Sequence, residues 1–144
     1  MIETDTIKLL RECDSGVKMG ISSISEVIDR VTSEDFKKIL NESKLAHEKL
    51  ENEIQEKLVE YDDDGKDPSI MLKGMSWLKT NIMIGLDNTD KTIADLMTDG
   101  CNMGVKSLNS YLNEYKAAEE YVKDITKKLI NLEERLAVDM RDYL

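Results

Sequence analysis

Three residues of this sequence can bind metal ions and also fall on the apolar face of an expected helix: Asp14, His47 and Glu133. Carboxylate oxygens and imidazole nitrogens are ligands that iron, manganese and zinc accept in proteins. His47 is the chain's one histidine and lies on the stripe that Leu40 and Leu50 define. Glu133 lies on the apolar stripe of its own segment. On a helix of 3.6 residues per turn both side chains should point inwards.

A two-metal centre inside a helical bundle needs more ligands than these. It takes one Glu from each of two helices and a Glu-x-x-His pair from each of the other two. Lys44 and Ile130 stand three residues before the histidine and the glutamate, where a ligand would be required. Asn102, the counterpart of Asp14 in a repeat set out below, carries no charge. We therefore expect no cofactor and no working two-metal centre.

Buried polar groups need hydrogen-bond partners. If His47 and Glu133 both point inwards, the expected arrangement is a hydrogen bond between them or to Asp14, Lys18 or Asn102. The arrangement would be structural, without catalysis.

A reduced metal site is the alternative. Iron or zinc would be held by Asp14, His47 and Glu133, with help from Cys13 or Cys101. Otherwise we expect both cysteines to be reduced and buried as small hydrophobic side chains. A further alternative is a hydrophobic ligand held in the glycine-lined centre of the bundle.

The segments that must position these residues are duplicated. Residues 13–18 read Cys-Asp-Ser-Gly-Val-Lys, and residues 101–106 read Cys-Asn-Met-Gly-Val-Lys, 88 positions later. A repeated, half-apolar helical segment predicts two similar hairpins. Gly16, Gly20 and Gly104 weaken helices, which predicts that a neighbouring backbone approaches closely at each of them.

Apolar spacings of three and four predict helices over residues 4–31, 34–61, 91–116 and 119–143. Short connections make the first two, and the last two, antiparallel neighbours. Residues 62–90 form a long crossover with an extra helix at 69–84, anchored by Trp77, and its acidic start at 62–67 is predicted to be a solvated turn. This all-α arrangement, two repeated hairpins joined by a long crossover, is a ferritin-like four-helix bundle.

Three stretches carry a resemblance to a known family. They are Gly-Met-Ser-Trp-Leu-Lys at 74–79, Ile-Ala-Asp-Leu at 93–96 and Val-Lys-Ser-Leu-Asn-Ser-Tyr at 105–111. In this pattern of spacings the chain resembles a family of uncharacterised bacterial ferritin-like domains. The resemblance implies the same fold, and it implies that a metal site inside the bundle must be tested for. In a register shifted by one turn, the family's acidic positions fall at Gly16 and Gly104.

Composition sets the remaining expectations. The chain has 144 residues, enough for one domain over 1–144, and a net charge of −10. That charge disfavours nucleic acid and anionic lipid as partners. There is no apolar run of the ~20 residues that a membrane span needs, and the acidic N-terminus predicts no signal peptide. We expect a cytoplasmic, non-enzymatic protein that binds a protein partner or forms a homodimer.

Overall fold

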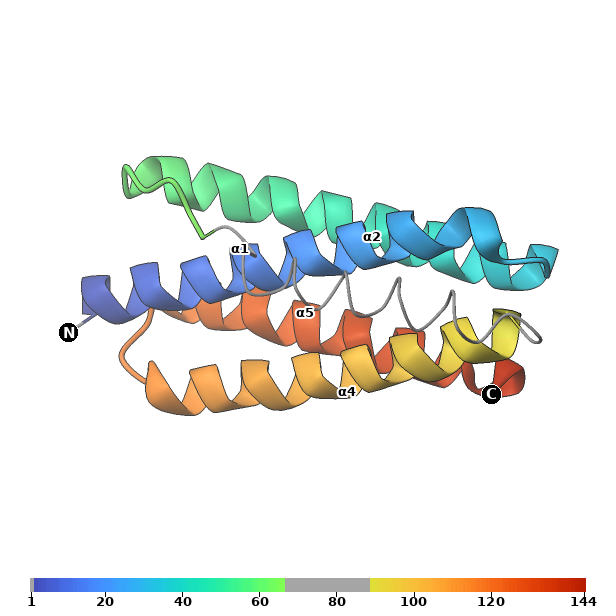
Figure 1. Cartoon of the computed structure of the whole chain (residues 1–144). Coiled ribbons are helices and arrows are strands. Elements are labelled where there is room, and N and C mark those ends of the chain that lie inside the picture. The colour runs from blue at the N-terminus through green and yellow to red at the C-terminus, as the bar shows by residue number, and fades with distance from the viewer. Residues whose placement is uncertain (1, 67–88) are drawn as a thin grey trace.

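The computed structural model describes residues 2–66 and 89–144, and all regular structure in these two stretches is helical. The α-helices are α1 (Ile2–Val27), α2 (Glu34–Glu60), α4 (Thr89–Glu114) and α5 (Glu120–Asp139), as Figure 1 shows. Short 3₁₀ turns follow α1 at Ile28–Arg30 and α5 at Arg141–Tyr143. The all-α prediction is confirmed.

The predicted helix bounds are right to within a few residues at most ends. The first helix stops at Val27 and the last at Asp139, each four residues before the predicted end, because a 3₁₀ turn replaces the final α-helical turn. The helix predicted at 69–84, with Trp77, lies outside the described residues.

Polar contacts fix the directions of the helices. Asp90, in the first turn of α4, accepts hydrogen bonds from the backbone N–H groups of Thr32 and Ser33 at 2.8 and 3.0 Å. At the opposite end of the bundle, Asp5 of α1 accepts from the N–H of Ala117, between α4 and α5, at 3.0 Å. Helix α4 therefore begins where α1 ends, and α2 and α4 run in the same direction (Figure 1).

The start of α2 shows how the sequence ends one helix and begins the next. Ser33 is the N-cap, and its hydroxyl accepts from the N–H of Phe36 at 3.2 Å. Glu34 and Asp35 place negative charge in the first turn, where the helix dipole favours it. These local signals account for the start of α2 at Glu34.

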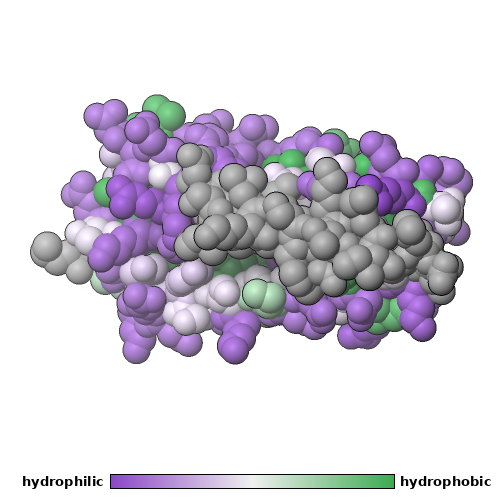
Figure 2. Space-filling view, viewed as in Figure 1, coloured by the Kyte–Doolittle hydropathy of each residue, from purple (hydrophilic) through white to green (hydrophobic). Residues whose placement is uncertain are grey.

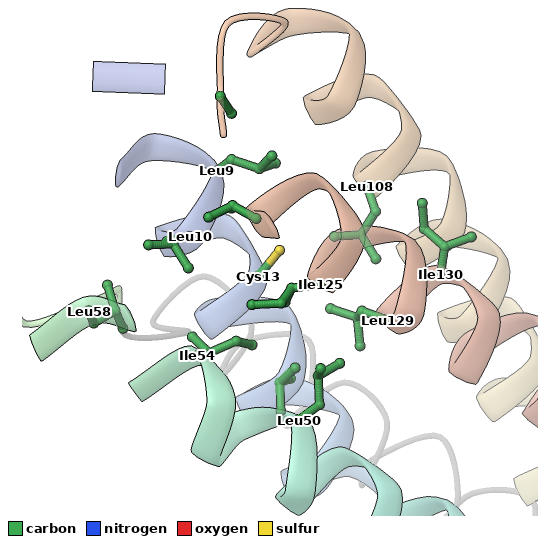
Figure 3. Close-up of a cluster of buried hydrophobic side chains, with 13 residues drawn as sticks. Leu9, Leu10, Cys13, Leu50, Ile54, Leu58, Leu108, Ile125, Leu129 and Ile130 are labelled. Carbon is green, nitrogen blue, oxygen red and sulfur yellow. The ribbon is translucent and has the colours of Figure 1, made fainter. Parts of the chain in front are cut away.

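The apolar side chains of the four helices meet in two clusters. The first cluster takes residues mainly from the first half of α1, the second halves of α2 and α4 and the first half of α5. In Figure 3 its labelled side chains point towards one another: Leu9, Leu10, Cys13, Leu50, Ile54, Leu58, Leu108, Ile125, Leu129 and Ile130. The second cluster fills the other end: Ile24, Val27, Val31, Phe36, Leu40, Ile93, Ala94, Met97, Cys101, Leu136 and Met140. Burial of this apolar surface is the main term that holds the bundle together.

Hydrophilic side chains dominate the outside. On the coloured part of the face in Figure 2, hydrophilic side chains predominate and apolar side chains are scattered among them. Across the described helices, none combines the length and hydropathy needed to cross a bilayer.

Candidate functional site

The two apolar clusters are separated by a polar contact at mid-length. His47 lies between Leu40 and Leu50 on α2, and Glu133 lies between Ile130 and Leu136 on α5. The imidazole Nε2 and the carboxylate Oε1 are 3.0 Å apart. The His47 side chain is completely buried, and that of Glu133 is 13% exposed. Two of the three residues singled out by type and position therefore contact each other directly.

The second ring nitrogen of His47 is also occupied. Its Nδ1 lies 2.7 Å from the backbone carbonyl of Ser43, one turn earlier on α2. A carbonyl only accepts, so Nδ1 carries a hydrogen. Only the imidazolium carries a hydrogen on both nitrogens, and it can donate to the carbonyl and to Glu133 at once.

The surroundings of His47 support that protonation state. Burial lowers the pKa of His47, but the hydrogen bond and the negative charge of Glu133, together with the Ser43 carbonyl, raise the pKa by more. The net effect is a pKa above the ordinary value for histidine. The raised pKa favours the imidazolium form, in which the contact is a buried ion pair that joins α2 to α5 across 86 positions of sequence.

Glycines on the other two helices face this pair. A Cβ added at Gly20 of α1 would lie 2.7 Å from Cδ2 and 2.8 Å from Nε2 of His47. A Cβ at Gly104 of α4 would lie 3.7 Å from Oε2 of Glu133. We call these four residues, one from each helix, the central polar layer.

The prediction that backbones approach these glycines closely is wrong. Side chains lie against them instead: His47 against Gly20, Glu133 against Gly104, and Leu129 against Gly16, where an added Cβ would be 3.4 Å from Leu129 Cδ2. The neighbouring space at Gly16 and Gly104 is thus taken by protein side chains, which leaves the hydrophobic-ligand alternative without support there.

Asp14 belongs to a different site. Its side chain is fully buried and accepts from Lys18 Nζ at 2.8 Å, Gln55 Nε2 at 3.0 Å and the backbone N–H of Lys66 at 3.0 Å. Gln55 is two turns beyond His47 on α2, roughly 12 Å along the helix axis. Asp14 therefore does not join the central polar layer. Within residues 2–66 and 89–144, no three Asp, Glu, His or Cys side chains are grouped closely enough to hold a metal ion.

A second carboxyl group, which the sequence reasoning missed, lies beside Asp14. Gln55 Nε2 donates to Glu51 Oε1 at 2.7 Å as well as to Asp14. Burial raises the pKa of Glu51 to about 7, helped by the hydrogen bond and charge of Asp14 and opposed by Gln55 and Lys18. Glu51 Oε2 is buried and accepts no hydrogen bond from the described residues. We call Asp14, Lys18, Glu51 and Gln55 the Asp14 cluster.

The acidic turn after α2 is bound to α1 more closely than a solvated turn would be. Asp63 accepts from Arg11 at 2.6 and 3.1 Å in a two-pronged contact, and its side chain is 11% exposed. Lys66 Nζ lies 2.6 Å from Glu12 Oε1. The prediction of a solvated turn is therefore wrong for Asp63, whereas the Lys66 side chain is 43% exposed.

Both cysteines are free and buried, as predicted. Cys13 Sγ lies 3.1 Å from the hydroxyl of Thr126, and burial raises the pKa of this thiol to about 12. Burial and the neighbouring Glu133 raise the pKa of Cys101 far above its ordinary value. The raised pKa values favour the thiol form of both side chains, which is a poor nucleophile.

Sequence signals existed for only part of this arrangement. Gly20, which faces His47, stands out as a helix-weakening residue inside an apolar stripe. Gln55 and Glu51 are ordinary polar residues of a charged helix, and nothing in their spacing distinguishes them. Asn102, the counterpart of Asp14 in the repeat, is exposed.

Comparison with known proteins found no relative: no family model, no curated protein and no solved structure matches the chain.

Proposed function

We propose that this protein is a non-enzymatic, cytoplasmic helical bundle of the ferritin-like type whose interior metal site has been replaced by an ion pair. It acts through its surface, as an interaction or structural protein, with a protein partner or a second copy of itself. No cofactor takes part in this function.

The protonation geometry of His47 carries the proposal. A histidine binds a metal through a nitrogen lone pair. The contacts to Ser43 and Glu133 occupy both nitrogens, and the form that satisfies both is the imidazolium, which offers no lone pair. The only histidine of the chain is therefore committed to holding α2 against α5.

The composition of the central polar layer supports the same conclusion. In a two-metal bundle every helix contributes an inward ligand at one level. Here α1 and α4 contribute Gly20 and Gly104 at the level of the ion pair. An added side chain at Gly20 would collide with the imidazole ring, so this layer is shaped around the histidine.

Helix order supports a ferritin-like connection. Helices α2 and α4 run in the same direction, so the chain has to travel the length of the bundle between them. That requirement is met by one long crossover and not by a short turn. The proposal includes the resemblance to bacterial ferritin-like domains and the two-hairpin repeat.

Metal analysis tests the proposal directly. The protein is purified without chelators, and its iron, manganese and zinc content is measured by inductively coupled plasma mass spectrometry. We expect far less than one equivalent of each metal. Thermal melting curves recorded with added iron(II) or zinc and with EDTA should coincide, because a ligand that does not bind the folded state does not stabilise it.

A matched variant identifies the source of any metal that is found. About one equivalent of metal, a rise in melting temperature with that metal, and loss of both in His47→Gln would overturn the proposal in favour of a reduced metal site. Metal that is retained in His47→Gln does not come from the central polar layer and leaves the assignment of His47 intact.

A further inference from the structure

Residues 62–66, which follow α2, lie across α1 and close over Asp14. We call this segment the strap. Its first residues end α2 in a Schellman arrangement: the N–H of Asp63 bonds the carbonyl of Leu58 at 2.9 Å, the N–H of Asp62 bonds that of Val59 at 3.0 Å, and Asp62 has a φ of 55°. The left-handed residue turns the chain away from the axis of α2.

The strap is then fastened to α1 at two points. Arg11 holds Asp63 in the two-pronged contact, and Glu12 holds the side chain of Lys66. The two cations are substantially exposed, with Arg11 at 46% and Lys66 at 43%, whereas the carboxylates of Asp63 and Glu12 are 11% and 15% exposed. Ion pairs with a solvated cation contribute little stability each and weaken in salt.

Asp14 supplies the buried contact. Its Oδ2 accepts the backbone N–H of Lys66, and Asp14 has no exposed surface. Gly65 has a φ of +81°, and a Cβ built there would overlap Asp14 Oδ2 and lie 3.1 Å from Leu58 Cδ1. Glycine at position 65 is thus what allows the strap to lie directly on the carboxylate.

We propose that the strap opens as a unit while the four helices stay folded. The hydrogen bond from the N–H of Lys66 to Asp14 is the main contact that keeps it closed. No residue of the strap is fully buried, and Gly65 lies against Leu58 of the first apolar cluster, so opening uncovers part of that side chain. Segments held by exposed polar contacts open locally at a small fraction of the free energy of global unfolding. Opening converts a sealed carboxylate, with Lys18 and Gln55 beside it, into a solvent-exposed polar site.

Native-state hydrogen exchange on the full chain tests this. Exchange of the Lys66 N–H reports on the hydrogen bond to Asp14. Exchange of the Ile54 N–H, in the first apolar cluster, reports on the folded helices. We expect Lys66 to exchange by an opening that is almost independent of low denaturant concentrations and is faster in 1 M NaCl. Ile54 should exchange by an opening that depends steeply on denaturant.

Two variants and a matched control complete the experiment. Asp14→Asn removes the charge of the carboxylate that accepts the Lys66 N–H. Arg11→Gln removes the ion pair with Asp63 without changing the apolar core. Asp14→Asn should speed exchange at Lys66 by ten-fold or more, and Arg11→Gln by up to about five-fold, as expected for one ion pair at the surface. Arg11→Gln should leave Ile54 unchanged, and Asp14→Asn should speed exchange at Ile54 less than at Lys66. Asp64→Asn makes the same chemical change on an exposed strap residue and should alter neither amide.

Three outcomes would overturn the proposal. Lys66 and Ile54 could show the same denaturant dependence, which means that the strap opens only with global unfolding. Arg11→Gln could leave exchange at Lys66 unchanged. Asp64→Asn could accelerate that exchange as much as Asp14→Asn does.

Discussion

The central polar layer and the Asp14 cluster are both buried, and both contain residues of metal-ligand type, yet they are satisfied in opposite ways. His47 and Glu133 meet across the bundle through a single contact between two hairpins. Asp14 is satisfied within one hairpin and the strap, by a lysine, an amide and a backbone N–H. The comparison shows that an inward-facing acid or histidine reveals nothing about its role until its partners are known.

The two sites also differ in what their loss would do. The ion pair lies between two apolar clusters and ties α2 to α5, so breaking it affects the whole bundle. The Asp14 cluster lies under a polar segment, so much of its effect is local. The predictions below separate the sites by magnitude and by pH.

The largest effect should follow from removing one member of the ion pair. Glu133→Leu leaves a buried imidazolium without its counter-charge, which we expect to lower the free energy of unfolding by about 3 kcal/mol. The double variant His47→Leu/Glu133→Leu should return most of that loss, because two apolar side chains leave no charge unpaired. Urea unfolding followed by circular dichroism at pH 7 measures both.

The chain offers a matched control for this test. Glu53 and Lys128 join the same two helices at 3.5 Å, but the pair is exposed. Lys128→Leu should change the free energy of unfolding by less than about 0.5 kcal/mol. Equal losses in Glu133→Leu and Lys128→Leu would show that the central contact is no different from a surface pair.

Glycine substitutions test the shape of the central polar layer. Gly20→Ala places a Cβ 2.7 Å from the imidazole ring, and we expect a loss of about 2 kcal/mol from overpacking. Gly100→Ala on α4 meets nothing within 4 Å and should gain about 0.5–1 kcal/mol from helix propensity. Gly104→Ala makes only ordinary contacts and should behave like Gly100→Ala. A gain in Gly20→Ala would mean that the ring moves aside freely.

These glycines show what the sequence could and could not predict. Apolar spacing placed His47 and Glu133 on inner faces, because the period of a helix fixes which side of it is buried. Helix propensity drew attention to Gly20, but the expected neighbour was a backbone and the observed one is an imidazole ring. The neighbour depends on the axial register between helices, which the pattern of any one helix does not contain.

For the strap, too, the sequence predicted the local structure but not the long-range contacts. The acidic run after α2 indicated a helix end, and α2 ends there. The partners of this run, Arg11 and Asp14, are about fifty positions earlier in the chain. The residues of the run alone therefore could not show whether the turn is solvated or bound to α1. Helix ends follow from local signals, whereas long-range polar contacts follow from the assembled fold.

A smaller effect is expected in the Asp14 cluster. The pKa of Glu51 is raised to about 7 from an unfolded value of 4.5, so its charged form is disfavoured in the folded protein. Glu51→Gln should therefore raise the free energy of unfolding at pH 8 by about 1 kcal/mol, after allowing for its partial exposure. Glu56→Gln, on the exposed face of the same helix, should change it little. The gain in Glu51→Gln should vanish at pH 4.

The two sites should also be separable by pH in the wild-type protein. Glu51 is protonated in the folded state and ionised in the unfolded state between pH 4.5 and about 7, so stability falls as pH rises through that window. The raised pKa of His47 means that its contribution is complete below pH 6.5 and is lost as pH rises through the folded value. Chemical unfolding measured every half unit from pH 4.5 to 9 should show Glu51→Gln flattening the lower part of the curve and Glu133→Gln the upper part. If Glu133→Gln leaves the slope above pH 6.5 unchanged, His47 is neutral in the folded protein, and its Nε2 retains the lone pair that a metal requires.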